Sequence, residues 1–332
     1  MLKTRSYWIV VLLLFLALAG AKSLGDRAAE WTCWPGGYGQ NAWMAYCNSE
    51  RYGVYDIEAV WHHIEPEVVP DIAAARVLTL SDSHLQNALS LGGASEWFSA
   101  HHFRWYMLGL PHAQSGFGER LLDNLRPHAD VVILDASPYF TGEIAQEERP
   151  MFSDLAASRV QVEELHEFQA WHQDFCAKAP WACGHNFAYF RSRLDGHWIF
   201  PATNKSIWIG RNSVPNDEKR FPTDSRPPED VALYPKFLEN ARRLVAKLST
   251  RPSCIVITHV PAERNLQGLA PFLADGLGVR VVEPQVSNLS TFDTQHLTPQ
   301  SSVLWTQAFL KELEPVLRDC LPPGATTAAN LQ

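Results

Sequence analysis

The chain has 332 residues, of which 46% are hydrophobic and 19% are charged, and its formal net charge is −8. This composition is typical of a globular protein with a substantial core. The negative charge makes a nucleic-acid backbone a poor partner and argues against a nucleic-acid-binding protein.

The first 21 residues have the pattern of an export segment. Lys3 and Arg5 precede an uncharged run from Tyr7 to Ala21, which is short for a bilayer span of roughly 20 apolar residues. Ala19-Gly20-Ala21 has the small-x-small pattern of a cleavage site. We therefore expect residues 1–21 to be a secretory signal peptide or, alternatively, an uncleaved N-terminal anchor. Both readings place the remaining chain outside the cytoplasm, in the periplasm or cell envelope.

The cysteine count agrees with export, because an even number of cysteines in an exported chain favours disulfides. The six are Cys33, Cys47, Cys176, Cys183, Cys254 and Cys320. Short separations favour the pairs Cys33–Cys47 and Cys176–Cys183. Cys254 begins an apolar stretch and is also compatible with a buried free thiol.

Strands and helices are predicted to alternate along most of the chain. Residues 22–71 read as an irregular N-terminal extension, and residues 72–325 as one domain with a large irregular insertion at about 141–230. Within that domain we expect strands at 77–80, 103–108, 131–134, 253–259 and 278–283. We expect helices at 84–90, 116–125, 160–178, 231–248 and 263–273, and a last helix from Pro299 with Thr298 as its N-cap. This alternation predicts a three-layer α/β/α domain with a central parallel sheet.

Polar residues follow several of these apolar strands. Ser83, Gly109 and the segment 135–138 come after the first three strands, and His259 ends the fourth. Ligands of such sheets bind beyond the carboxyl ends of the strands. We therefore expect a functional site there.

A serine, a histidine and an aspartate supply the chemistry predicted for that site. Asp293 precedes His296 by three residues, so its carboxylate can reach the imidazole and fix the tautomer. His296 is the candidate base that activates the Ser83 hydroxyl. Ser83 starts a helix, where free backbone N–H groups and the helix dipole favour a developing oxyanion. The backbone of Gly109 is a candidate second donor, and His84 and His259 are candidate substrate-binding residues.

Each of these residues also has a structural explanation. Ser83 fits a helix N-cap, and Asp293 with His296 fits a solvated turn before a helix. Gly109 is also compatible with a glycine in an ordinary turn, and His259 with a buried histidine of the core. The twelve Trp residues fit core packing, with stacking on sugar rings as the alternative.

Three motifs resemble those of the SGNH (GDSL-type) hydrolase superfamily. Ser81-Asp82-Ser83-His84 is similar to the first block, Gly-Asp-Ser, with Ser83 in the nucleophile position. Leu108-Gly109-Leu110-Pro111 is similar to the second block, whose glycine donates to the oxyanion. Asp293-Thr294-Gln295-His296 has the spacing of the last block, Asp-x-x-His. The resemblance implies an SGNH/flavodoxin-like fold and acyl chemistry.

The third block departs from the family pattern, because Leu134–Tyr139 contains no Asn where the family has an oxyanion-donating one. The Ser137 hydroxyl is a candidate substitute, with a plain Ser-Pro turn as the alternative. Loss of one such donor typically lowers the rate by about 10²–10³, which weighs against efficient hydrolysis.

A Ser-Pro turn beside an N-terminal membrane signal resembles an exported branch of the superfamily that serves teichoic-acid D-alanylation and polysaccharide O-acetylation. This resemblance implies a serine esterase or O-acyltransferase acting on an acylated envelope glycan, with a membrane-bound O-acyltransferase as a possible partner. No metal or cofactor is expected, and a metallophosphoesterase is a distant alternative. The main alternative is a non-catalytic exported carbohydrate-binding or assembly protein with the same fold.

Overall fold

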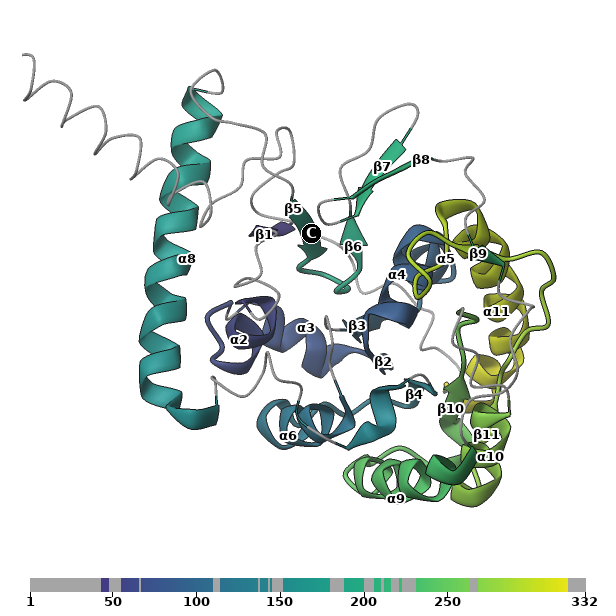
Figure 1. The fold of residues 1–332 in the computed structure, drawn as a ribbon. Helices are drawn as coiled ribbons and strands as arrows, with labels where there is room; N and C mark the ends of the chain where they lie inside the picture. The colour runs from purple at the N-terminus through teal and green to yellow at the C-terminus, as the bar shows by residue number, and fades with distance from the viewer. Residues whose placement is uncertain are drawn as a thin grey trace, which may run out of the picture.

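A five-stranded parallel sheet organises the protein (Figure 1). The computed structural model describes residues 43–47, 55–65, 67–109, 114–136, 138–142, 144, 152–179, 188–199, 206–209, 212–215, 221–222, 231–262 and 268–321. Its strands are β2 (Val77–Ser81), β3 (Trp105–Gly109), β4 (Val131–Asp135), β10 (Ile255–Thr258) and β11 (Arg280–Val281). They lie in the order β11-β10-β4-β2-β3, and every neighbouring pair is parallel. The predicted central parallel sheet is confirmed.

The strand order of this sheet reverses at β2, and such a switch point is where doubly wound sheets bind their ligands. Counted along the chain, the strands lie in the order 2-1-3-4-5, which is a doubly wound arrangement. The chain leaves β2 for one edge and returns to β4 on the other side of it. Ligands of such sheets bind at this reversal, beyond the carboxyl ends of the first and third strands. Those ends belong here to β2 and β4.

Helices cover both faces of the sheet and complete a three-layer α/β/α structure. The helices are α2 (Tyr55–Trp61), α3 (Val68–Ala74), α4 (Ser83–Leu91), α5 (Ala94–Ala100), α6 (Ser115–Leu125), α8 (Leu155–Lys178), α9 (Tyr234–Val245), α10 (Leu269–Leu277) and α11 (Pro299–Cys320). Short 3-10 turns span Pro138–Thr141, Val231–Leu233 and Pro252–Cys254. Apart from α8, these helices surround the sheet in Figure 1.

Alternation along the strands divides the core in two, because successive strand residues point to opposite faces. Val77 and Ile133 pack with apolar residues of α4, α5 and α11. Leu78 and Leu134 pack with those of α2, α3, α6, α9 and α10. Both sheet faces are therefore buried, which explains why the strands read as continuous apolar runs.

The insertion adds short antiparallel strands. Its strands are β5 (Ala188–Ser192), β6 (Trp198–Ile199), β7 (Ser206–Ile209), β8 (Asn212–Pro215) and β9 (Phe221–Pro222). β5 pairs with β6 and with β1 (Trp43–Cys47), and β7 pairs with β8. β9 pairs with β12 (Ser290–Thr291), the strand just before the Asp-x-x-His segment. The insertion therefore has strands of its own, although we expected it to be irregular.

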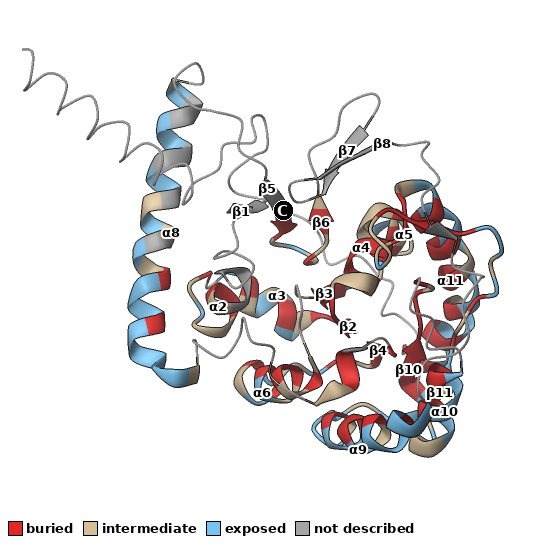
Figure 2. Cartoon of the chain, in the orientation of Figure 1, coloured by how far each residue is buried: buried red, intermediate tan, exposed pale blue. Residues whose placement is uncertain are grey.

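The long helix α8 lies at the edge of the molecule beside α2 (Figures 1 and 2). Its buried residues include Ser158 and Val162, whereas Trp171 and Phe175 are exposed. Among the described residues, no helix is long and apolar enough to cross a bilayer. The predicted export segment at 1–21 lies outside the described residues.

Two expectations for the N-terminal half differ from the structure. The end of the predicted irregular segment 22–71 contains α2 and the start of α3, and its residues Ala59, Val60 and Val68 are buried in the core. Helix α5 was not predicted, because Gly92-Gly93 and a seven-residue length hide its pattern. Residues before the predicted domain boundary at residue 72 therefore contribute to the core that covers the sheet.

The alternative that Cys254 is a buried free thiol is wrong. Cys254 forms a disulfide with Cys320, across a sequence separation of 66 residues. Locality in the sequence does not predict this pair. Helix α11 instead runs along the sheet and brings its last residue to the start of β10. The expected pairs Cys33–Cys47 and Cys176–Cys183 involve side chains outside the described part of the chain.

Candidate active site

Ser83 lies at the turn from β2 into α4, where it is the first helical residue. Asp82 caps the helix, because its extended backbone turns the carboxylate back to accept from the His84 backbone N–H at 2.8 Å. One turn later, Asn87 Nδ2 donates to the Ser83 carbonyl oxygen at 2.8 Å. The capped first turn thus holds Ser83 at the carboxyl edge of the sheet, beside the reversal between β2 and β4.

The segment between β12 and α11 is a tight loop closed by backbone contacts. Phe292 N–H donates to the His296 carbonyl at 3.0 Å, and Thr298 N–H donates to the Ser290 carbonyl at 2.9 Å. Thr298 also caps α11, since its hydroxyl accepts from the Ser301 backbone N–H, as the sequence predicts. The loop is therefore fixed at both ends.

Inside this loop, Asp293 is held by the backbone that follows it. Its Oδ1 accepts from the N–H groups of Gln295 and His296 at 3.1 and 2.7 Å. Thr294 has φ +74°, a left-handed conformation that is rare for a β-branched residue. Such strained backbone clusters at functional sites, and here it accompanies the turn that folds Asp293 back over His296.

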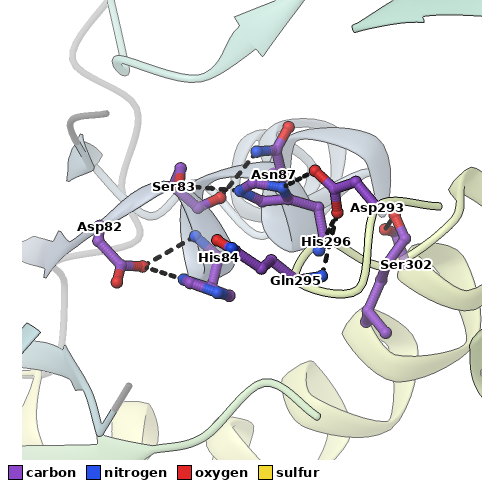
Figure 3. A network of polar contacts seen from close by, with 9 residues as sticks. Asp82, Ser83, His84, Asn87, Asp293, Gln295, His296 and Ser302 are labelled. Atoms are coloured by element: carbon purple, nitrogen blue, oxygen red, sulfur yellow. Dashed lines mark hydrogen bonds and ion pairs between the residues drawn. The ribbon is translucent and has the colours of Figure 1, made fainter. Parts of the chain in front are cut away.

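The structure brings Ser83, His296 and Asp293 together in one line of hydrogen bonds (Figure 3). His296 Nε2 lies 2.8 Å from Ser83 Oγ, and His296 Nδ1 lies 2.6 Å from Asp293 Oδ2. Ser83 and His296 are 213 residues apart in sequence. With Asp293 accepting from Nδ1–H, Nε2 is left as the nitrogen that accepts the serine proton. This is the geometry that turns a serine hydroxyl into a nucleophile.

The electrostatics of Asp293 agree with that assignment of protons. Burial raises the pKa of Asp293, but the hydrogen bonds and charge of His296, with the two backbone N–H groups, outweigh burial and hold the pKa below its ordinary value. The carboxylate is therefore ionised at neutral pH. A carboxylate in this position can orient the His296 ring and stabilise its imidazolium form.

His84 contributes a second imidazole at the same place. Its Nδ1 lies 2.9 Å from Asp82 Oδ1, and its ring stacks on the His296 ring with centroids 5.1 Å apart and an interplanar angle of 27°. The ring is mostly buried, at 12% exposure. The predicted substrate-binding residue thus adjoins the catalytic candidates, and its contact with substrate stays a prediction.

Gly109 ends β3 under close packing. A Cβ at this position would lie 2.2 Å from Gln86 Oε1 and 2.7 Å from Ser81 Oγ, so only glycine fits. The Gly109 carbonyl accepts from Arg191 Nη2 of β5 at 2.7 Å. Packing therefore explains the glycine, and its donation to an oxyanion stays a prediction.

The remaining candidates are less informative. Ser137 lies outside the described residues. His259 follows β10 and is buried, with 4% exposure, so pocket lining stays a prediction. Among the described residues, no group of three or more His, Cys, Asp or Glu side chains is arranged to hold a metal ion.

Two residues that organise the site were not predicted. Asp82 caps α4 and pairs with His84, and its signal in the sequence was an Asp just before a predicted helix start. Arg191 is fully buried and links the insertion to the end of β3. A single Arg in an irregular stretch gives no sequence signal for that role.

The chain matches no protein-family model, no curated protein and no solved structure. The interpretation of the site therefore rests on its own geometry and on the motifs in the sequence.

Proposed function

We propose that Ser83, His296 and Asp293 are a catalytic triad and that the protein is a serine-dependent esterase or O-acyltransferase. The observation that carries this proposal is the pair of contacts at His296, 2.8 Å to Ser83 Oγ and 2.6 Å to Asp293 Oδ2. A helix-capping role for Ser83 needs neither contact, since Asp82 already caps α4. Nor does a solvated turn require the loop to contact a serine that is 213 residues away in the sequence.

The proposed reaction has two halves. Ser83 Oγ attacks the ester carbonyl while its proton passes to His296 Nε2. The carbon–oxygen bond to the leaving alcohol then breaks, and His296 returns the proton to that alcohol, which leaves acyl-Ser83. In the second half, water or an acceptor hydroxyl gives its proton to His296 and attacks the acyl group. Ser83 is regenerated, and the product is an acid or a new ester.

The oxyanion of each tetrahedral intermediate lies near the start of α4 in this proposal. The backbone N–H groups in the first turn of a helix have no partner within the helix, and the dipole there favours negative charge. Gly109 and Ser137 are the further donor candidates.

The proposed substrate is an acylated cell-envelope glycan, in the periplasm or cell envelope. This part rests on the export pattern of residues 1–21 and on the resemblance to SGNH proteins of envelope acylation. The disulfide Cys254–Cys320 supports it, because structural disulfides form mainly in oxidising compartments.

Covalent labelling tests the proposal directly. We expect the native protein to react with a fluorophosphonate probe and to turn over p-nitrophenyl acetate. Ser83→Ala should lose labelling completely and turnover by at least about 10³-fold. Ser99→Ala, an exposed serine at the end of α5, is the matched control and should behave like the native protein. Labelling that persists in Ser83→Ala excludes the triad.

Product analysis separates the two forms of the enzyme. An acetylated glycan is incubated with and without a hydroxyl-bearing acceptor glycan, and free acetate is compared with acetylated acceptor. A native protein that binds glycan but never reacts with the probe would instead support the non-catalytic alternative.

A further inference from the structure

A second Asp–His pair adjoins the proposed triad and has no role in the mechanism above. Asp82 and His84 flank Ser83 in the sequence, and the His84 ring stacks on the face of His296 at 5.1 Å. Figure 3 shows both pairs meeting beside Ser83, one from the start of α4 and one from the loop before α11. The base of the proposed mechanism is thus in direct contact with another imidazole.

The charges around His84 favour its protonated form. Asp82, which is 5% exposed, accepts from His84 Nδ1 at 2.9 Å. Burial lowers the pKa of His84, but the charges of Asp82, Asp135 and Asp293, with the Asp82 hydrogen bond, outweigh burial and raise the pKa to about 9. These carboxylates come from three elements, the β2–α4 turn, the end of β4 and the loop before α11. The three surrounding carboxylates therefore favour the imidazolium form of His84 at neutral pH.

We propose that His84 is a positioning residue for the base: its fixed positive charge opposes protonation of the stacked His296 and so keeps His296 neutral and able to accept the Ser83 proton. The benefit of this charge to proton transfer rests on the proposed function, whereas the electrostatic coupling between the two rings does not. Among the described residues, the groups in contact with the His296 ring are Asp293 on one nitrogen, Ser83 on the other, and the rings of His84 and Phe292. Of these, His84 is the one that its surroundings favour as a cation.

The size of the coupling follows from the ring separation. Two unit charges about 5 Å apart, at an effective dielectric constant of about 20, repel by an amount equivalent to about two pH units of titration. The negative charge of Asp82 offsets part of this, so we expect a net effect of about one pH unit. The same repulsion makes protonated His296 a stronger acid, which helps it return the proton to the leaving alcohol.

Titration of the individual histidines tests the coupling without any substrate. Histidine ring signals are followed by NMR against pH in the native protein, and the His296 signal is assigned by its loss in His296→Asn. In His84→Asn, the titration midpoint of His296 should rise by about one pH unit. His84→Lys restores a positive charge and should return the midpoint toward the native value. His101→Asn, which removes a ring stacked on Trp97, is the control and should leave the midpoint unchanged.

A purely structural role for His84 predicts a different result. If the ring only fills space, His84→Asn changes stability but leaves the His296 midpoint where it was, and that outcome overturns the inference. Should His84→Asn fail to fold, His84→Gln, which keeps more of the side-chain volume, is used in its place.

The pH dependence of probe labelling then separates this inference from the proposed function. If the native protein is labelled at Ser83, the acidic limb of its labelling rate should move up by about one pH unit in His84→Asn. An unmoved limb overturns the inference and leaves the esterase proposal intact. Absence of labelling in the native protein overturns the esterase proposal, and the NMR midpoints still decide whether the rings are coupled.

Discussion

The two Asp–His pairs at the carboxyl edge of the sheet share a geometry but differ in what surrounds them. In each pair, an aspartate accepts from Nδ1 of a histidine and from the backbone N–H of the same residue. Asp82 does so as the cap of a helix, with a spacing of two residues. Asp293 does so across a strained loop, with a spacing of three.

The pairs differ in the groups that surround each imidazole ring. Nε2 of His296 lies beside Ser83 Oγ, so in the proposed mechanism this pair has a proton to accept. The His84 ring lies among three carboxylates, which hold its own proton in place. An Asp–His pair therefore does not by itself define a general base, and in the proposed mechanism it is the contact of Nε2 with a serine hydroxyl that does.

Replacing the aspartate of each pair in turn tests whether the two pairs differ, and the largest expected effect is on the reaction rate. Asp293→Asn keeps the size of the side chain but removes the charge and favours the wrong tautomer of His296. We expect the rate of p-nitrophenyl acetate turnover at about pH 8 to fall by about 10³–10⁴. Asp82→Asn makes the same chemical change in the other pair, and Asn still caps a helix. Its rate should fall by less than about ten-fold. Equal losses in both variants would show that the two pairs are not distinct in function.

The second effect is on stability, and the two pairs respond at opposite ends of the pH scale. The pKa of His84 rises from 6.5 to about 9 on folding. Its stabilising contribution is therefore complete below pH 6.5 and is lost as the pH rises through 9. Folding lowers the pKa of Asp293. The stabilising contribution of Asp293 is therefore present at pH values above the ordinary pKa of an aspartate and is lost as the pH falls below it.

Urea unfolding at about pH 6, 8 and 10 measures the first of these. We expect the native protein to have a higher free energy of unfolding than His84→Asn at pH 6. This difference between the two proteins should shrink by about 2–3 kcal/mol from pH 6 to pH 10. A constant difference across this range would mean that His84 gains no proton affinity on folding.

The smallest effect concerns the loop that carries the second pair. Thr294→Gly removes a β-branched side chain from a left-handed conformation and should raise the free energy of unfolding by about 0.5–1 kcal/mol. Asn288 also has a positive φ, of 61°, but Asn tolerates this conformation better. Asn288→Gly is therefore the matched control, with a smaller gain in thermal denaturation. Destabilisation of Thr294→Gly would show that contacts of the side chain outweigh the strain.

The sequence predicted the parts of the fold that depend on local pattern. The continuous apolar runs before Ser83 and Asp135 became β2 and β4, and Thr298-Pro299 became the start of α11. The Asp-x-x-His spacing likewise predicted the Asp293–His296 contact, because residues three apart in a turn can touch.

The remaining features depend on contacts between distant segments. The disulfide between Cys254 and Cys320, the pairing of β9 with β12 and the stacking of His84 on His296 each need the tertiary fold. Side chains of neighbouring residues on a helix diverge, so the position of His84 after Ser83 does not by itself predict that both reach His296. That contact arises because the loop before α11 approaches the start of α4.

The disulfide between Cys254 and Cys320 also encloses Asp293 and His296 within a covalent ring of chain. A protease that cuts the backbone once inside this ring would produce two pieces that stay tethered through sulfur. If the cut falls between Cys254 and His296, the piece that carries the imidazole remains attached to the piece that carries the hydroxyl. Reduction would break this tether, so the oxidised protein should tolerate such a nick better than the reduced protein.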